Sequence, residues 1–590
     1  MKPQQRSLEP YLFTWVMGKR TAETRWTQTS EGGGWLSSLY SFSNTFSDGW
    51  KLFSSALIAS LRFERFGVTS SLRRVLIHLM KAKVLLSATA PLLSFLLPAL
   101  AAEPAWFNVH DFGAKGDGQT INTEAINRAI EEASKHGGGT VFFPAGNYLS
   151  YSIRLQNNIS LHLDQGAVLI GAEPANSAGY DAPEPNTPYD KYQDFGHNHW
   201  KNSLIWGIGL HDISILGQGM IWGKGLTHTN HFVQGAGNKA ISLKECRNFT
   251  IKDISILHAG HFGILATATD NLTLSNLKID TDCDGFDVDC CKNVRIDNCT
   301  VNSPYDDAIC LKSSYALGYP RITENVTIAN CQVSGYNVGA LLDGTFKRTY
   351  KEYQPNSCPN GRIKLGTESN GGFKNITIAN CVFDFSFGLA LETVDGALLE
   401  DIAISNLTMR DIVDCPIFIR LGGRMRAPPS TPMSTCRRIS INNVVVYNAH
   451  HKCGCIISSL PGHNIEDVTL GNITIHYKGG GTADMAKRQV EEYEKDYPEP
   501  QDFGTLPSYG FFFRHVTDLK VHDVETHFLS EEQRPPFVLD DVQDAWFHQV
   551  IGQKAPKSPA FLFTNVKSIT VQQCPGARDS LIRSARKREL

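Results

Sequence analysis

Two clusters of aspartates stand a short interval apart in the sequence and could perform acid–base chemistry. The first spans residues 282–287 and contains Asp284, and the second spans residues 305–312 and contains Asp306 and Asp307. Crowded carboxylates repel one another unless one keeps its proton, which is how a general acid is made at neutral pH. Glycosidic hydrolysis needs such an acid and a carboxylate that activates water. The clusters therefore indicate a glycosidase, with a solvated acidic turn or a calcium site as the alternative.

The spacing of the clusters predicts that three carboxylates meet. If Phe286 faces inward, Ile309 does so too, because the strand patterns match at an offset of 23 residues. The same offset places Asp307 one coil above Asp284. Asp306 has the opposite parity, so a bend in the chain must bring it back toward the other two.

A recurrent hexapeptide predicts the elements that hold these clusters. It reads polar, aliphatic, any, aliphatic, any, then Asn or Asp, and this alternation indicates a short strand with one buried face. Its tightest intervals are 22 to 26 residues, as expected for a β-solenoid. We therefore predict an all-β, right-handed parallel β-helix over residues 158–580. Clear copies begin at Asn248, Asn271, Asn293, Asn325, Asn375, Asp401, Arg438 and Asp467.

The terminal Asn or Asp of each hexapeptide is expected at the same bend in every coil. There it can bond neighbouring backbone groups and accept a left-handed conformation. Many copies also contain Asn-x-Thr, a glycosylation signal, but their position at strand starts favours the structural interpretation. Before the coils, residues 103–157 predict an N-terminal cap, in which apolar residues recur at helical spacing from Ile121 to Ala133 and glycines 137–139 end the helix.

The first hundred residues carry an export signal in an unusual place. A basic stretch at Met80, an apolar run from Val84 to Leu100 and a small-residue cleavage site near Ala102 make a signal peptide over residues 80–102. We predict that translation starts at Met80 and that residues 1–79 are a mis-called upstream extension, with a genuine N-terminal module as the alternative. The product is then secreted or periplasmic.

Charge and cysteine content exclude several partners. Removing residues 1–102, with 12 Lys/Arg and 5 Asp/Glu, leaves 44 basic and 54 acidic residues and a net charge of −10. This acidic balance argues against nucleic acid and, after signal cleavage, against a membrane as partner. The 14 cysteines have no metal-type spacing, and many are expected to be small buried residues. We expect a monomer with no cofactor and a short basic tail at residues 581–590.

With these motifs in place, residues 105–575 resemble glycoside hydrolase family 28, the polygalacturonase and rhamnogalacturonan hydrolase family. The family's Asn-Thr-Asp-Gly motif corresponds to residues 282–285, and its Gly-Asp-Asp motif to residues 305–307. The resemblance implies inversion of configuration, Asp306 as general acid, and Asp284 with Asp307 holding the attacking water. It implies no metal, and a pectic polysaccharide or oligosaccharide as the partner.

Two departures from the family pattern bear on the substrate. The family's Gly-His-Gly should fall near residues 360–366, where there is no histidine, and its Arg-Ile-Lys should fall at residues 388–393. The family's basic pair is absent from residues 388–393, but the same triplet, Arg362-Ile363-Lys364, occurs one coil earlier. It either supplies the missing cations from there or is a coincidence. Without a basic pair, cleavage within plain polygalacturonan is disfavoured and rhamnogalacturonan fits better. The candidate substrate-binding residues are Asp287, Lys312, Arg362, Lys364, Glu368 and Glu392.

Two long insertions are expected to shape the groove, and two rival functions stay open. The insertions are residues 336–359 and residues 478–507, and the second contains a predicted helical run at residues 483–497. One rival is a pectate-type polysaccharide lyase, which needs a cation, usually calcium, and a basic residue that takes the proton. The other is a non-catalytic carbohydrate-binding solenoid, which has no reason to place three aspartates in this register.

Overall fold

A computed structural model describes residues 105–175, 179–229, 231–349, 359–450, 452 and 454–590. The predicted upstream extension and signal peptide lie outside these residues. The described residues belong to one compact unit, residues 102–590. Within them, no helix is long and apolar enough to cross a bilayer.

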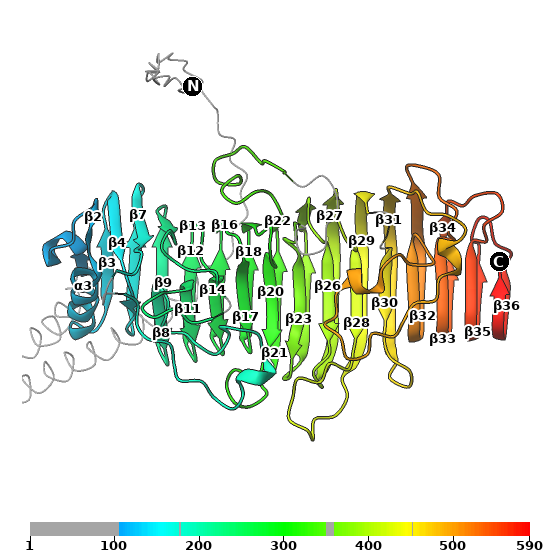
Figure 1. Ribbon diagram of the computed structural model, residues 1–590, viewed down its shortest axis with the longest axis horizontal. Helices are drawn as coiled ribbons and strands as arrows, with labels where there is room; N and C mark the ends of the chain where they lie inside the picture. Colours follow the sequence, from blue (N-terminus) through cyan, green and yellow to red (C-terminus); the bar gives the residue numbers. More distant parts are fainter. Residues whose placement is uncertain (1–104, 176–178, 230, 350–358, 451, 453) are drawn as a thin grey trace, which may run out of the picture. The chain divides into compact units, whose positions relative to one another are not determined.

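The chain folds into a right-handed parallel β-helix whose strands stack into three columns (Figure 1). Most strands pair with their counterparts one coil before and one coil after, which satisfies the backbone groups of these strands. We call the column that carries the aspartate clusters the site column. It consists of β5 (Ile153–Arg154), β8 (Ile205–Ile208), β11 (Lys239–Lys244), β14 (Phe262–Thr267), β17 (Asp284–Asp289), β20 (Ile309–Ser313), β23 (Ile363–Ser369), β26 (Leu389–Thr393), β28 (Ile417–Leu421) and β30 (Cys455–Ser458).

The other two columns contain the recurrent hexapeptides and the short strands that follow them. The second column consists of β1 (Trp106–Asn108), β3 (Gly139–Phe143), β6 (Ile159–Leu163), β9 (His211–Gly217), β12 (Arg247–Lys252), β15 (Asp270–Ser275), β18 (Lys292–Asp297), β21 (Thr323–Ala329) and β24 (Phe373–Ala379). The third consists of β2 (Asp117–Ile121), β4 (Gly146–Ser150), β7 (Ala167–Gly171), β10 (Met220–Trp222), β13 (Ser255–Leu257), β16 (Lys278–Asp280), β19 (Thr300–Asn302), β22 (Gln332–Ser334) and β25 (Val382–Asp384).

Longer strands run through the bend between columns in the C-terminal half. They are β27 (Leu398–Arg410), β29 (Thr435–Ala449), β31 (Ile465–Tyr477), β32 (Phe511–Phe528), β33 (Phe537–His548) and β35 (Phe561–Gln572), with the short β34 (Ile551–Gly552). The final strand, β36 (Ser580–Glu589), pairs antiparallel with β35. The residues of the expected basic tail thus form a strand, because the edge of β35 offers unpaired backbone groups that a further strand can satisfy.

The core of the β-helix is a set of stacks of inward-facing side chains. In the site column, Ile264, Phe286, Ile309, Ile363 and Leu389 occupy one register position in successive coils. All five are fully buried or nearly so. The offset of 23 residues between Phe286 and Ile309, predicted from the alternation, is confirmed by this register.

The terminal asparagines of the hexapeptides, such as Asn276 and Asn330, have the predicted left-handed conformation, and the first asparagines form a ladder along the coils. Asn271, Asn293, Asn325 and Asn375 each have φ between 52° and 60°. Each donates a side-chain N–H to the carboxamide oxygen of the asparagine one coil before, over 2.7 to 3.2 Å. Asparagine tolerates this left-handed conformation better than most residues because its short polar side chain bonds locally. The amide groups that glycosylation would modify are therefore used in the ladder.

An amphipathic helix covers the N-terminal end of the solenoid. The helix α3 (Thr123–Lys135) follows the 3-10 turn η2 (Val109–Phe112), and its apolar face buries Ile126 and Ile130. Buried Asn127 fixes it to the first coil, since its Nδ2 donates to the Ser152 carbonyl over 3.0 Å and its Oδ1 accepts from the Arg154 backbone N–H over 2.9 Å.

The insertion at residues 478–507 is an extended strap and not a helix, so the predicted helical run is wrong. Its regular structure is limited to two short 3-10 turns, η4 (Met485–Lys487) and η5 (Pro500–Phe503). Arg420 donates to the backbone carbonyls of Glu492 and Tyr493 over 2.6 and 3.0 Å. Carbonyls that would close helical hydrogen bonds are thus bound by an arginine of β28, which satisfies the strap in an extended form.

Candidate active site

The two aspartate clusters meet where β17 and β20 begin. The backbone N–H of Asp307 donates to Asp284 Oδ1 over 3.1 Å, and that of Gly285 donates to the Asp307 carbonyl over 3.0 Å. Glycine is required at position 285, because an added Cβ would lie 2.4 Å from Val301 Cγ1 and 2.5 Å from the Ala308 carbonyl oxygen. Gly285, next to Asp284, therefore allows the close approach of the two coils.

The three carboxylates converge on one point. One oxygen each of Asp284, Asp306 and Asp307 lies within 4.8 Å of the others. Asp284 and Asp307 are only 4% and 2% exposed, whereas Asp306 is half-buried and its neighbour Tyr305 is 52% exposed. The Asp306 carboxylate lies near Asp284 and Asp307 although its position has the opposite parity, in agreement with the bend expected from the sequence. The site is thus reached from solvent on the side of Asp306.

Asp307 is held ionised by two cations of the next coil. Burial opposes its ionisation, but Arg362, Lys364 and Lys312 outweigh it and lower the pKa of Asp307 to about 2. Arg362 Nε donates to Asp307 Oδ1 over 2.6 Å, and Lys364 Nζ lies 3.4 Å from Oδ2. The literal Arg-Ile-Lys of β23 therefore reaches the aspartate cluster directly.

The other two carboxylates are shifted in the opposite direction. Burial and then the charge of Asp287 raise the pKa of Asp284 well above its ordinary value. Burial and then the charge of Asp307 raise the pKa of Asp306. Neighbouring carboxyl groups whose pKa values are pushed apart are suited to separate acid and base roles.

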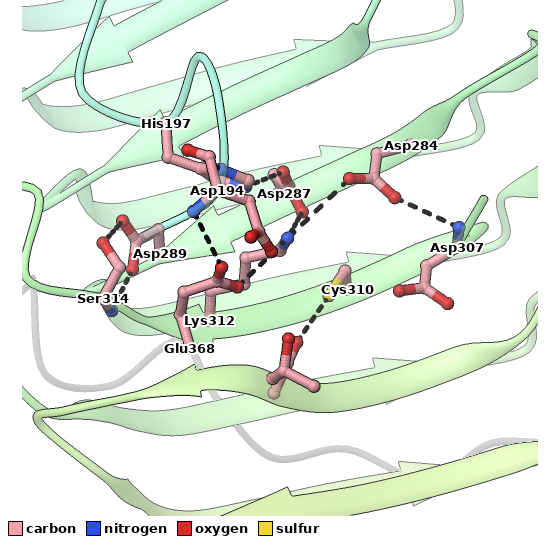
Figure 2. A network of polar contacts seen from close by, with 12 residues as sticks. Asp194, His197, Asp284, Asp287, Asp289, Asp307, Cys310, Lys312, Ser314 and Glu368 are labelled. Carbon is pink, nitrogen blue, oxygen red and sulfur yellow. Dashed lines mark hydrogen bonds and ion pairs between the residues drawn. The ribbon is translucent and has the colours of Figure 1, made fainter. Parts of the chain in front are cut away.

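A third cation, Lys312, lies at the centre of a buried network beside Asp284 (Figure 2). Its Nζ lies 3.8 Å from Asp284, 3.7 Å from Asp287 and 3.4 Å from Glu368. His197 Nε2 contacts the second oxygen of Asp287 over 3.0 Å. Lys312 thus connects Asp284 to a network of buried ionisable groups, which are Asp287, Glu368 and His197.

The sixth candidate, Glu392, lies on the neighbouring strand β26. Its carboxylate is 3.8 Å from Lys364 Nζ, and Lys364 pairs in register with Ala390. Burial raises the pKa of Glu392 to about 7 against the opposing effect of Lys364 and Arg362. All six residues predicted to bind substrate are thus buried and ion-paired within the site, and direct contact with substrate stays a prediction.

Two loops that the sequence reasoning missed complete the site. Arg426 lies in the loop after β28; its guanidinium donates to Glu368 over 2.9 Å and to Asp194 over 2.6 Å. The Asp194 backbone N–H in turn donates to Glu368 over 3.2 Å. One signal was available: weaker copies of the hexapeptide begin at Asn158 and Asp212, and the long interval between them contains the loop that carries Asp194.

Three groups of residues at the site have ligand atoms that could hold a cation, and one of them is His197, Asp284 and Asp287. The second is the trio itself, and the third is His228, His261 and Cys283, whose ligand atoms also lie within 4.8 Å of one another. Cys283 Sγ donates to Asp306 over 3.5 Å. The expected absence of a metal stays a prediction. The 12 cysteines in the described part of the chain are all buried.

Part of the chain, including both aspartate clusters, matches the model of a known protein family. A family model described as "Rhamnogalacturonase A/epimerase, pectate lyase-like" matches residues 106–363. A probable polygalacturonase of Vitis vinifera is 26% identical over 327 residues, covering 51% of this chain and 60% of the relative. The chain therefore spans about 60% of the length of that curated relative.

Solved structures share the fold. The exopolygalacturonase of Thermotoga maritima superposes with a TM-score of 0.50 at 20% identity, covering 64% of this chain and 88% of that one. The family 28 exopolygalacturonase of Yersinia enterocolitica gives 0.52 at 18% identity, with coverages of 80% and 79%. The solved structures thus share the parallel β-helix fold, and the sequence comparison shows similarity to polygalacturonases.

Proposed function

We propose that the protein hydrolyses α-linked, galacturonic-acid-containing pectic polysaccharide. The observation that carries this proposal is the convergence of Asp284, Asp306 and Asp307 within 4.8 Å, with only Asp306 open to solvent. The named relatives, polygalacturonases and exopolygalacturonases, support the same class of substrate. We further propose that the enzyme acts as a monomer after export, in keeping with the predicted signal peptide.

The opposed pKa values suggest how the carboxylates divide the work. Asp306, with a raised pKa and an open face, protonates the leaving oxygen. Asp307, ionised beside Arg362 and Lys364, accepts a hydrogen bond from the attacking water together with Asp284 and takes its proton. Water adds to the anomeric carbon as the glycosidic bond breaks, and no covalent intermediate forms.

Inversion of configuration is part of the proposal on the strength of the family motifs. Acid and base are usually ~6.5–9.5 Å apart in inverting enzymes and ~5–5.5 Å apart in retaining ones. The nearest oxygens here lie within 4.8 Å, so separation by itself does not favour inversion. Proton NMR of the first product tests the point: inversion gives the β-anomer initially, and an initial α-anomer would contradict it.

Product analysis separates the hydrolase from its lyase rival. Full-length protein is incubated with polygalacturonan and with rhamnogalacturonan, with and without chelator. We expect new reducing ends without an unsaturated product, unaffected by chelator. Ultraviolet absorbance from an unsaturated product, abolished by chelator, would establish a lyase that uses the carboxylate trio as a cation site.

A further inference from the structure

The strap at residues 478–507 places an acidic side chain against the site column. Glu499, just before η5, lies against Arg362 of the coil that follows the aspartates. Arg362 Nη1 and Nη2 donate to its two oxygens over 2.9 and 2.8 Å, in a bidentate pair. The Glu499 side chain is 18% exposed, whereas that of Arg362 is 3% exposed. Glu499 therefore lies on the solvent side of Arg362 and covers it.

A tyrosine two residues earlier fixes this part of the strap. The hydroxyl of Thr367 donates to Tyr497 Oη over 2.9 Å. Lys364 Nζ and the Arg424 guanidinium lie 5.4 and 5.3 Å from the centre of the Tyr497 ring, within the range of cation–π attraction. These contacts of Tyr497 hold the neighbouring Glu499 in position against Arg362.

The donors of Arg362 are consumed within the protein. Its Nε bonds Asp307 and its two terminal nitrogens bond Glu499, so no fork is left for a substrate carboxylate. Lys364 is within 4 Å of Asp307 and Glu392. Two cations therefore face three carboxyl groups, and a uronate entering here would meet an excess of acidic groups.

We propose that Glu499 is a specificity-determining residue that occupies the place of a uronate carboxylate, so that the sugar unit bound beside Asp307 is an uncharged one. This inference rests on the proposed pectic substrate and narrows it to chains with a neutral unit at the cleavage site. A neutral sugar such as rhamnose and a methyl-esterified galacturonate share that chemistry.

The test replaces Glu499 by glutamine, which keeps its size and removes its charge. Turnover of polygalacturonate, methyl-esterified polygalacturonan and rhamnogalacturonan is measured for the full chain and for Glu499→Gln. We expect kcat/KM on polygalacturonate to rise about tenfold, mainly through KM and less so at high salt. The wild-type preference between the other two substrates identifies the neutral unit, and their kcat/KM should change less than about twofold in the variant.

Two control variants separate charge from packing. Glu499→Asp keeps the charge and should retain the wild-type discrimination, whereas Asp496→Asn removes an exposed charge from the same strap and should change nothing. Equal changes on all three substrates, or no gain on polygalacturonate, would overturn the inference while leaving a pectic hydrolase in place.

A binding measurement keeps the inference testable without turnover. Calorimetric titration of trigalacturonate into the wild type and Glu499→Gln should show about tenfold tighter binding by the variant. If no pectic substrate is cleaved but this difference appears, the proposed hydrolysis fails and the role of Glu499 stands. Equal affinity of the two proteins would refute that role.

Discussion

Two stretches of the site column share one scaffold but carry opposite chemistry on their outward face. One register position holds Asp287, Cys310 and Lys364 in the coils of the aspartate cluster. Further along, the same position holds Phe418 and Ile456, which pack with strap residues in a separate apolar cluster. The inward stacks are aliphatic or aromatic in both stretches, so backbone geometry does not distinguish them.

The strap packs against the apolar stretch and makes polar contacts with the charged stretch. Val490, Phe503 and Leu506 bury their side chains against the apolar coils, with Phe503 6.0 Å from the Phe418 ring. Between Val490 and Phe503 the strap carries Glu499 to the charged coils. Apolar burial stabilises the loop, and the polar contacts define the site.

The largest effect is expected when the proton donor of the charged stretch is removed. Asp306→Asn should lower kcat on pectic substrate by about 10²–10⁴-fold, because proton transfer to the leaving oxygen is lost. Reducing-sugar release and thermal unfolding are measured together. Retained activity, or carbohydrate binding as the sole function with no turnover by the wild type, would contradict the hydrolase.

The corresponding change in the apolar stretch should affect stability instead of chemistry. Phe418→Ala removes a fully buried ring and should cost about 3–5 kcal/mol in the free energy of unfolding. Denaturant unfolding measures this cost, and kcat below the transition should stay within a few-fold of the wild type. A Phe418→Leu control should lose much less stability; a kcat loss matching that of Asp306→Asn would erase the distinction between the stretches.

A smaller effect should sharpen the role of the buried cations. In Lys364→Met, Asp307 keeps Arg362 but loses one opposing charge, so its pKa should rise from about 2 toward its ordinary value. Because the water-activating carboxylate must be ionised, activity falls as pH drops through this pKa. The acid limb of the kcat/KM profile should therefore move to higher pH, and an unmoved limb would assign it to another group.

The smallest effect is expected in the asparagine ladder, which both stretches share. Asn293→Ala should cost about 1–2 kcal/mol in stability, from lost side-chain hydrogen bonds and from the strain of alanine at φ 59°. Asn293→Gly keeps the backbone relaxed and isolates the hydrogen-bond contribution. Equal losses in the two variants would show that backbone strain contributes little, and neither should change kcat.

Much of the site could be predicted because it follows the period of the coil. The offset of 23 residues aligned Asp284 with Asp307; the adjoining residues pair at this offset, and the Asp307 backbone N–H donates to Asp284. The sequence left the Arg-Ile-Lys at residues 362–364 open between a functional pair and a coincidence, since parity alone does not say how far a long side chain reaches. The structure brings both cations to Asp307.

The loop residues could not be predicted, for a physical reason. Glu499 is 137 residues from Arg362, and Asp194 is 174 residues from Glu368, and both lie in segments without a repeat. The extended form of the strap depends on Arg420 and on an apolar surface that exists only once the coils have stacked.

The sequence by itself determined the solenoid, its capping helix and the register of the aspartates, because alternation and spacing repeat wherever strands stack. Only the tertiary structure decided which cations serve which carboxylates, and which loop covers Arg362. Those pairings join segments far apart in the chain, and their energies depend on burial and distance that no local pattern encodes.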